Sequence, residues 1–420
     1  MDKFVIHGGT PLSGTVRISG AKNATIALMP ATLLASGVSR LHNSPVLRDV
    51  TTMTRVLETI GEKIERRDDA LVIDSTKIKS FEAPYEHVKK MRASIYVLGP
   101  LVARFGKAKV SLPGGCAWGP RPVNLHLEAL QRLGADISLD AGYIIAKASR
   151  LKGTRISFDI SSVGATINIM MAATLAQGTT EIHNAAIEPE VTTVAEYLVT
   201  MGAKIEGIGT QSLIIEGVDE LHAADHQNIP DRIEAGTFLI AGAITRGDVT
   251  ITDCEPSHID ALLEKLEDIG CEIKRSSTSI TLRAPRELRS VDVSTAVYPG
   301  FPTDLQAQWI ALMSVAQQTS VVTDTVYFDR FTHIPELNRL GSNIEVTENV
   351  AVVRGVERLR GAKVMSTDLR ASASLILAGL AAEGETEVLR VYHIDRGYEA
   401  IERKLQGLGA DIRRVAGEEF

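Results

Sequence analysis

The sequence has few cysteines, few aromatic residues and no long apolar run. Its 420 residues include only 3 cysteines, at positions 116, 254 and 271. An odd number of widely spaced cysteines argues against a disulfide framework and favours a reducing compartment. No apolar stretch approaches the ~18–20 residues that span a bilayer, and the first ten residues lack the apolar core of a signal peptide. We therefore expect a cytoplasmic protein without membrane insertion.

An excess of basic residues is also absent. The 45 Lys and Arg residues are outnumbered by 52 Asp and Glu residues, which gives a formal net charge of −7. That balance argues against nucleic acid as the main partner. The hydrophobic fraction of 44% and the charged fraction of 23% are ordinary for a globular protein, and they exclude disorder, collagen and coiled coil. At roughly 100–200 residues per domain, the length predicts two to four domains.

A short signature recurs six times and divides the chain into units of similar length. Each copy combines an apolar residue, a glycine and a strand-like pattern, as in LGADIS at 133–138 and MGAKIE at 201–206. The signature ends an amphipathic helix, its glycine suits the left-handed position after that helix, and strands follow. The six glycines, separated by 68 to 73 residues, are Gly61, Gly134, Gly202, Gly270, Gly341 and Gly409.

Each unit also contains a helical segment without Asp, Glu, Lys or Arg. A helix that is apolar on every side is buried on every side, so we expect six helices inside the protein with sheets and amphipathic helices around them. These segments are 23–36, 93–103, 164–177, 235–245, 305–318 and 371–382. The six units separate into three and three near Pro230, which predicts two similar domains with a ligand cleft between them.

Charged residues stand at the entrances of these helices. An acidic residue there can simply cap the helix, whereas a cation is unfavourable at a helix N-terminus unless an anion joins it. The cations therefore point to an anion-binding site, and simple capping stays open for the acids. The charged residues are Lys22, Arg92, Asp231, Arg232, Asp304, Asp368 and Arg370.

One loop, at 113–122, is dense in Gly and Pro and contains Cys116 beside Arg121. A thiol near a cation in such a loop is placed like a reactive cysteine. By contrast, we expect Cys254 and Cys271 to be packing residues. His222 and His226 have a helical i, i+4 spacing, but no further ligand motif accompanies them, so we expect surface residues and no metal site.

Together these features resemble the enolpyruvyl transferases over essentially the whole chain. The resemblance is closer to the members that use UDP-N-acetylglucosamine as acceptor than to the related shikimate-pathway synthase, which is not expected to carry the PGGC loop. The matching motifs are SGAKNA at 19–24, MRAS at 91–94, LPGGC at 112–116, RPVNLH at 121–126, SVGAT at 162–166, EPE at 188–190, PDRIEAGTF at 230–238, FPTD at 301–304, DLRAS at 368–372 and HIDRGYE at 393–399.

The resemblance implies an α/β fold in the form of a two-domain inside-out α/β barrel, or β/α prism. Six βαβαββ repeats would build it, three in each domain. The first domain would cover residues 22–229 and contain the catalytic loop at about 112–122. The second would combine residues 1–21 with 230–420, and the active site would lie in the cleft between the two.

The resemblance also implies a reaction without metal or cofactor. The enolpyruvyl group of phosphoenolpyruvate is transferred to the 3-hydroxyl of UDP-N-acetylglucosamine and phosphate is released, which is the first committed step of peptidoglycan synthesis. Cys116 matches the proton donor and the thiol that fosfomycin alkylates, and Asp304 matches the general base. The cations that match the phosphate and carboxylate contacts are Lys22, Arg121 and Arg396.

Other positions match residues that hold the nucleotide sugar or line the cleft. Ile160 departs from the family pattern, because some members place a lysine there, and Trp118 and Pro120 make the loop bulkier. Two alternatives stay open: a paralogue with a different hydroxyl acceptor, and a non-catalytic nucleotide-sugar sensor. The sequence leaves the oligomeric state open. The matching contacts are Asn23, Arg121, Pro122, Val123, Asn124, Leu125, Ser162, Val163, Gly164 and Val326, and the additional cleft cations are Arg92, Arg330 and Arg370.

Overall fold

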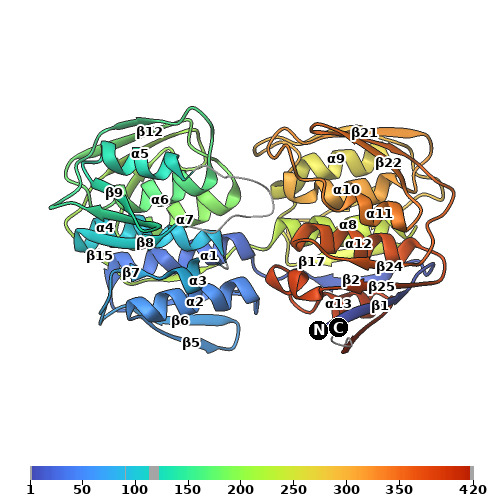
Figure 1. The fold of residues 1–420 in the computed structure, drawn as a ribbon, viewed down its shortest axis with the longest axis horizontal. Helices are drawn as coiled ribbons and strands as arrows, with labels where there is room; N and C mark the ends of the chain where they lie inside the picture. Colours follow the sequence, from blue (N-terminus) through green and yellow to red (C-terminus); the bar gives the residue numbers. More distant parts are fainter. Residues whose placement is uncertain (1, 90, 113–122, 417–420) are drawn as a thin grey trace. The chain divides into compact units, whose positions relative to one another are not determined.

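The structure is a computed structural model that describes residues 2–89, 91–112 and 123–416. The chain divides into two compact units (Figure 1), which we call unit 1 (Met1–Ser19 with Pro230–Phe420) and unit 2 (Gly20–Ile229). The chain passes from unit 1 to unit 2 after Ser19, two residues earlier than the boundary expected from the sequence.

Within the described residues, each unit contains three four-stranded sheets that share one strand order. The sheet of β20 (Val293–Ser294), β21 (Thr319–Thr323), β22 (Asn343–Thr347) and β23 (Val350–Arg354) illustrates it. Its first strand pairs parallel with the second, and both the second and the third pair antiparallel with the fourth. Helices α10 (Gln306–Met313) and α11 (Ile334–Arg339) connect the first three strands, so the order of elements along the chain is βαβαββ.

Strands from distant parts of the chain complete three of the six sheets. In unit 1, β1 (Asp2–His7) pairs with β25 and β26, and β2 (Ser13–Arg17) pairs parallel with β17. In unit 2, β16 (Asp225–Gln227) pairs parallel with β4 (Val38–His42), although 182 residues separate them along the chain. The remaining sheet strands of unit 1 are β17 (Asp248–Thr252), β18 (Glu272–Arg275), β19 (Ser279–Arg283), β24 (Lys363–Met365), β25 (Glu385–Leu389) and β26 (Asp411–Ala416).

Unit 2 has the same sheet plan, with one additional short pair of strands, β3 (Ala35–Ser36) and β15 (Leu221–His222). The first of its three sheets has the order β16-β4-β6-β5, the second β7-β8-β10-β9 and the third β11-β12-β14-β13. The strands are β5 (Lys63–Arg67), β6 (Ala70–Asp74), β7 (Glu82–Ala83), β8 (Lys107–Ser111), β9 (Asp136–Asp140), β10 (Tyr143–Lys147), β11 (Arg155–Ser157), β12 (Thr179–His183), β13 (Lys204–Glu206) and β14 (Ser212–Glu216).

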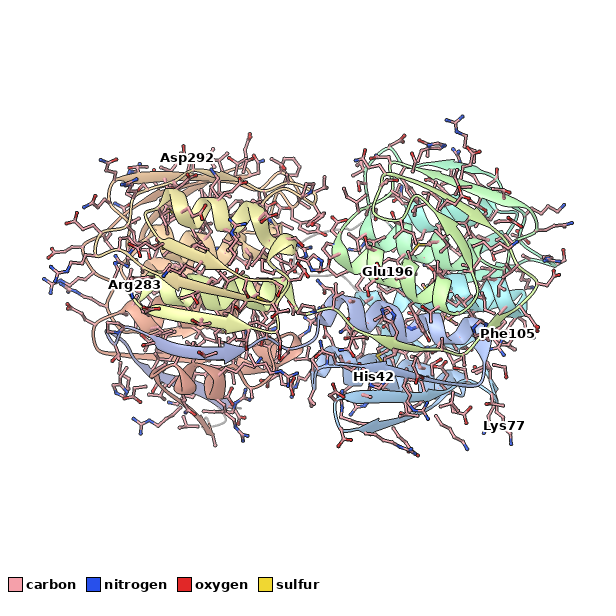
Figure 2. All side chains as sticks on the ribbon, turned by 180° about the vertical axis from the view of Figure 1, so that it is seen from behind. His42, Lys77, Phe105, Glu196, Arg283 and Asp292 are labelled. Carbon is pink, nitrogen blue, oxygen red and sulfur yellow. The ribbon has the colours of Figure 1, made fainter. Side chains whose placement is uncertain are left out.

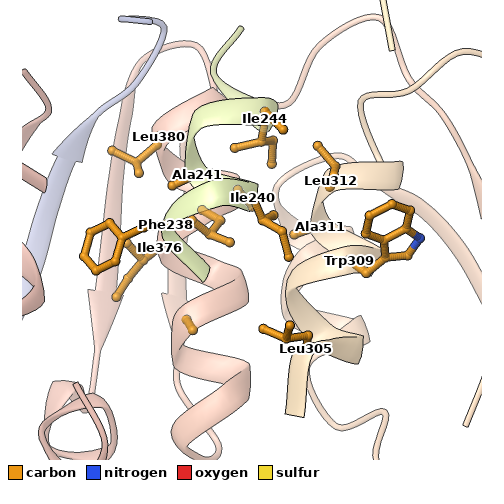
Figure 3. Close-up of a cluster of buried hydrophobic side chains, with 14 of the residues drawn as sticks. Phe238, Ile240, Ala241, Ile244, Leu305, Trp309, Ala311, Leu312, Ile376 and Leu380 are labelled. Carbon is orange, nitrogen blue, oxygen red and sulfur yellow. The ribbon is translucent and has the colours of Figure 1, made fainter. Parts of the chain in front are cut away.

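The charge-free segments form the helices at the centre of each unit. In unit 1, α8 (Arg232–Ile244), α10 and α12 (Leu369–Ala381) pack against one another. Figure 3 shows Phe238 of α8 beside Ile376 of α12, and Ile240 of α8 on the side of Ala311 of α10. Trp309 is fully buried, as expected for a core residue. The corresponding helices of unit 2 are α1 (Lys22–Ala31), α4 (Leu98–Phe105) and α6 (Val163–Ala173), extended by the 3-10 turns η1 (Thr32–Leu34) and η2 (Arg92–Val97).

Amphipathic helices and sheets surround these central helices within each unit. In α9 (Asp260–Asp268) the buried residues are Leu262, Leu263 and Leu266, which lie on one face. Exposed charged side chains such as Lys77, Glu196 and Arg283 project from the outside (Figure 2). The other helices are α2 (Arg48–Ile60), α3 (Tyr85–Val88), α5 (Asn124–Arg132), α7 (Pro189–Thr200) and α13 (Ile401–Gly407), with the 3-10 turns η3 (Pro256–Ile259), η4 (Thr303–Leu305) and η5 (Val391–Arg396).

The six signature glycines have the predicted conformation. Their φ angles lie between 92° and 123°, each just after a helix ends. A side chain is strained in this region of φ, so glycine allows the chain to leave the helix and enter the next strand. Among the described helices, none combines the length and the apolar character needed to cross a membrane.

Candidate functional site

Lys22 begins α1 and pairs with a carboxylate that the sequence interpretation missed. Its Nζ lies 2.9 Å from Oδ2 of Asp49, in the first turn of α2, and both side chains are largely buried. No side chain caps α1, so Lys22 adds positive charge to the positive end of the helix dipole. The carboxylate of Asp49 compensates that charge. Asn23, the next residue of α1, is half-buried.

Arg92 and residues 162–164 lie at the starts of the two other central helices of unit 2. Arg92 is the first residue of η2, which leads into α4. Ser162 caps α6, since its hydroxyl accepts a hydrogen bond from the N–H of Ala165 at 3.3 Å. Val163 and Gly164 form the first turn of α6, and all three residues are half-buried. Capping explains the local structure at Ser162 and leaves its predicted sugar-nucleotide contact as a prediction.

A buried histidine lies beside this group. His126 is 3% exposed, and its Nδ1 is 3.0 Å from Nδ2 of Asn168. Its Nε2 faces the start of α6, because a Cβ on Gly164 would lie only 3.2 Å from that atom. Burial, together with the positive charge of Arg92, lowers the pKa of His126 to about 3. With its pKa so low, the buried ring is neutral at neutral pH.

The remaining predicted residues of unit 2 fall partly in the Cys loop. Cys116, Arg121 and Pro122 lie outside the described residues, as do Trp118 and Pro120. Val123 precedes α5, and Leu125 packs against the core. Asn124 is exposed, and its side-chain amide lies 3.4 Å from Oε1 of Glu128. Ile160, the departure noted in the sequence, is 68% exposed.

The predicted base in unit 1 lies between two arginines. Nη1 of Arg330 is 2.8 Å from Oδ1 of Asp304, and Nη2 of Arg370 is 2.7 Å from Oδ2. The side chains of both arginines are at most 8% exposed, whereas that of Asp304 is 25% exposed. Burial raises the pKa of Asp304, but the two guanidinium groups outweigh it and hold the pKa well below its usual range. Asp304 is thus an ionised carboxylate with a surface open to solvent.

The capping interpretation holds for two of the other acids. Asp231 accepts hydrogen bonds from the N–H groups of Ile233 and Glu234 and caps α8. Asp368 caps α12 in the same way, with the N–H of Arg370 at 2.8 Å. Asp304 differs, because it lies within η4 and not at its N-cap position, and both of its oxygens face arginines.

Arg370 also contacts a buried polar cluster at the centre of unit 1. Its guanidinium lies over the ring of Tyr398, 5.5 Å from the centroid. The hydroxyl of Tyr398 is 2.7 Å from Oγ1 of Thr237 on α8, and Nε2 of Gln308 on α10 donates to both oxygens at 3.2 Å. These contacts tie all three central helices to Arg370. Charge-free helices therefore still supply the polar groups that orient this arginine.

Two further predicted residues lie at the same end of unit 1. Val326 follows β21, and its N–H donates to Oδ1 of Asp324 at 3.0 Å. Arg396 is the last residue of η5 and is half-buried. The structure thus brings Asp304, Arg330 and Arg370 into direct contact, and their shared site is the best-defined part of the prediction.

The other cysteines and histidines behave differently from site residues. Burial raises the pKa of Cys254 to about 11 and that of Cys271 to about 12, and both are buried. The helical spacing of His222 and His226 was misleading, since they lie on the separate short strands β15 and β16. His226 is half-buried and hydrogen-bonds to Thr193 at 2.8 Å. Within the described ranges, no group of three His, Cys, Asp or Glu side chains could hold a metal ion.

A cavity of about 550 Å³ lies in unit 2, at the other ends of the central helices. Arg104, Phe105 and Gly106 at the end of α4 line it, with Leu34 at the end of η1 and Arg150. None of the described site residues predicted from the sequence lines this cavity.

Comparison with known proteins identifies the class. A family model described as EPSP synthase (3-phosphoshikimate 1-carboxyvinyltransferase) matches residues 6–405, and the chain belongs to this family. A solved structure of the enolpyruvyl transferase NikO from Streptomyces tendae is similar over 99% of both chains, with a TM-score of 0.89 and 28% sequence identity.

Full-length relatives indicate a particular activity within this family. The UDP-N-acetylglucosamine 1-carboxyvinyltransferase of Chloroherpeton thalassium is 61% identical over 423 aligned positions, which cover 100% of this chain and 99% of that protein. The protein of the same name from Chlorobium chlorochromatii is 55% identical, with 100% of both chains covered. The chain is therefore similar over its whole length to enzymes with this one activity.

Proposed function

We propose that the chain transfers the enolpyruvyl group of phosphoenolpyruvate to the 3-hydroxyl of UDP-N-acetylglucosamine and releases phosphate, as the first committed step of peptidoglycan synthesis in the cytoplasm. The observation that carries the proposal is the full-length identity of 61% to an enzyme with this printed activity. The Asp304 cluster supports it, because an ionised, partly exposed carboxylate is what a general base for a sugar hydroxyl requires.

The reaction is an addition followed by an elimination. The Cys116 thiol gives its proton to the methylene carbon of phosphoenolpyruvate, the sugar O3 bonds to the neighbouring carbon, and Asp304 accepts the O3 proton. In the second step the carbon–oxygen bond to phosphate breaks and the Cys116 thiolate takes a proton back from the new methyl group. Phosphate leaves with the proton that Asp304 had accepted, and the enol ether forms. Lys22, Arg121 and Arg396 bind the phosphate and carboxylate of phosphoenolpyruvate.

The low pKa of Asp304 sets the timing of the base step. A weakly basic carboxylate does not remove a proton from a free sugar hydroxyl, whose pKa is far higher. The hydroxyl becomes acidic only while O3 is bonding to the electron-poor carbon. Asp304 therefore accepts the proton as that bond forms, and Arg330 and Arg370 hold its oxygens in place for the transfer.

The nucleotide sugar is bound by Asn23, the run from Arg121 to Leu125, residues 162–164 and Val326. Arg92, Arg330 and Arg370 contribute positive charge for the diphosphate and for phosphoenolpyruvate. The assignment includes the prediction that each unit is an inside-out barrel of three βαβαββ repeats. The starts of the central helices would then face the substrates. That the site lies between the two domains stays a prediction.

The test is an acceptor panel with the purified full chain. Phosphate release from phosphoenolpyruvate is followed with UDP-N-acetylglucosamine, with 3-phosphoshikimate, or without acceptor. We expect release only with UDP-N-acetylglucosamine. Release with another acceptor would favour the paralogue, and saturable binding of the sugar nucleotide without any release would favour the sensor.

A further inference from the structure

A buried carboxylate lies behind the predicted base and has no role in the scheme above. Asp324 follows β21 and is 0% exposed. Its Oδ1 accepts hydrogen bonds from the Thr295 hydroxyl at 2.7 Å and from the N–H groups of Val326 and Tyr327 at 3.0 and 2.9 Å. Its Oδ2 accepts a hydrogen bond from the hydroxyl of Thr303 at 2.7 Å. Four donors therefore hold this side chain in one orientation.

Thr303 connects that carboxylate with the Asp304 cluster. A carboxylate can only accept, so the single hydroxyl proton of Thr303 points toward Asp324. The lone pairs of Oγ1 are then free for Nη1 of Arg330, which lies 3.0 Å away. The same Nη1 is 2.8 Å from Oδ1 of Asp304. Arg330 is thus held between a hydroxyl whose orientation is fixed and the predicted base.

We propose that Asp324 is a positioning residue for the transfer reaction: by fixing the Thr303 hydroxyl as an acceptor, it holds Arg330 against Asp304. The same carboxylate accepts a hydrogen bond from the backbone N–H of Val326, which the family resemblance assigns to the sugar nucleotide. Asp324 therefore links the base to a substrate contact from a place that substrate does not reach. The proposal rests on the proposed function, and its test includes a measurement that does not.

The variant Asp324→Asn keeps the size of the side chain and reverses one hydrogen bond. Three donors meet at the Oδ1 position, so the amide oxygen takes that place and the amide NH2 faces Thr303. The Thr303 hydroxyl must then accept a hydrogen bond from the amide. Its own proton turns toward Arg330, so that two hydrogen-bond donors face each other. We expect Arg330 to move away from Asp304 and kcat to fall by up to ~10²-fold, as for a misplacement of about 1 Å.

The pH dependence of kcat distinguishes a loss of positioning from a general structural disturbance. Asp304 faces Arg330 and Arg370, with Tyr398 and Asp231 near Arg370 and His333 near Arg330. Loss of the Arg330 contact should raise the pKa of Asp304, so the acidic limb of the kcat profile should move to higher pH in Asp324→Asn. The matched control is Asp292→Asn, the same charge change at an exposed carboxylate of the same sheet region (Figure 2), where the profile should stay unchanged.

A carboxyl ¹³C NMR titration of aspartate-labelled protein gives the readout that needs no turnover. Asp304 is assigned with Asp304→Asn, and its titration should begin at higher pH in Asp324→Asn than in the unsubstituted chain. An inactive parent enzyme would contradict the proposed function while this titration still tests the positioning. A lowered kcat with an unchanged Asp304 titration would overturn the proposal. If Asp324→Asn does not fold, Thr303→Val removes the same link and must give the same shift.

Discussion

Lys22 and Asp49 form a buried ion pair that joins the first residue of α1 to the first turn of α2. Nζ and Oδ2 are 2.9 Å apart, and the side chains are 11% and 3% exposed. A lysine that is to bind the phosphate of phosphoenolpyruvate is flexible and strongly hydrated by itself. We therefore predict that the carboxylate of Asp49 holds Lys22 in place for phosphoenolpyruvate, although Asp49 belongs to no motif.

This pairing predicts a selective effect on phosphoenolpyruvate binding. In Asp49→Asn the size is kept but the charge that anchors Lys22 is lost. We expect KM for phosphoenolpyruvate to rise by about 10-fold, equivalent to ~1.4 kcal/mol, with a smaller change in kcat. Initial rates at varied phosphoenolpyruvate measure this. Asp136→Asn, at an exposed position of β9, is the control, and an unchanged KM in a folded Asp49→Asn variant would show that Lys22 needs no anchor.

Removal of the predicted base should affect turnover far more than binding. In Asp304→Asn the side chain still accepts a hydrogen bond from an arginine but no longer takes a proton. We expect kcat to fall by about 10²–10⁴-fold, the usual contribution of general base catalysis. Calorimetric titration should show that the affinity for UDP-N-acetylglucosamine changes much less. Near-normal turnover would assign the base to another residue.

Cys116 should be the only cysteine that reacts with fosfomycin. By the family resemblance its thiol lies near cations that also attract the phosphonate of this epoxide, whereas Cys254 and Cys271 are buried with raised pKa values. Peptide mapping should place the label on Cys116 alone. We expect Cys116→Asp to stay active and resist alkylation, and Cys116→Ser to be nearly inactive, because a hydroxyl is too weak an acid. Label on another cysteine would contradict the assignment.

The buried carboxyl of Glu62 should give unit 2 an unusual dependence of stability on pH. It is 3% exposed, and burial raises its pKa to about 7, although hydrogen bonds from Ser75 and Thr32 oppose the shift. Because the pKa of Glu62 is higher in the folded than in the unfolded chain, the free energy of unfolding falls as pH rises from about 4.5 through about 7. By pH 8 the loss amounts to about 3 kcal/mol, at 1.36 kcal/mol per pH unit.

Glu62→Gln removes this titration and keeps the shape. Its unfolding free energy should exceed that of the parent chain at pH 8, and the difference should vanish near pH 4. Denaturant unfolding at both pH values measures it, with Glu58→Gln, at an exposed position of α2, as the control. A pH-independent difference would mean that Glu62 is ionised in the folded state.

Local patterns predicted much of the fold. The signature glycines mark helix ends because a left-handed φ is a property of a few consecutive residues. The charge-free segments are central helices because burial on all sides requires that composition. The sheets were harder: β1, β2 and β16 pair with strands far along the chain, and such pairing leaves no local trace. The resemblance supplied the pairing of the N-terminus with the C-terminal part, which periodicity alone did not.

The sequence indicated candidate site residues where a charge is unusual for its position. Cations at helix starts, as at Lys22 and Arg370, are unfavourable next to the positive end of the helix dipole and therefore indicate an anion-binding site. Asp49 and Asp324 do not conflict with anything in the sequence, since acids near helix or strand ends are common on surfaces. Glu62 did leave a signal, because the other repeats carry a small residue after the signature glycine. Those residues are Ala135, Ala203, Cys271, Ser342 and Ala410.

The central claim is that this chain makes an enol ether from phosphoenolpyruvate and UDP-N-acetylglucosamine. The most direct measurement combines phosphate quantification with mass and NMR analysis of the nucleotide product from one reaction. We predict one phosphate for each UDP-N-acetylglucosamine consumed, and an enolpyruvyl group attached through oxygen at C3 of the sugar. Two results would contradict this claim. One is phosphate release without a modified sugar nucleotide, and the other is an intact sugar nucleotide after prolonged incubation with folded protein.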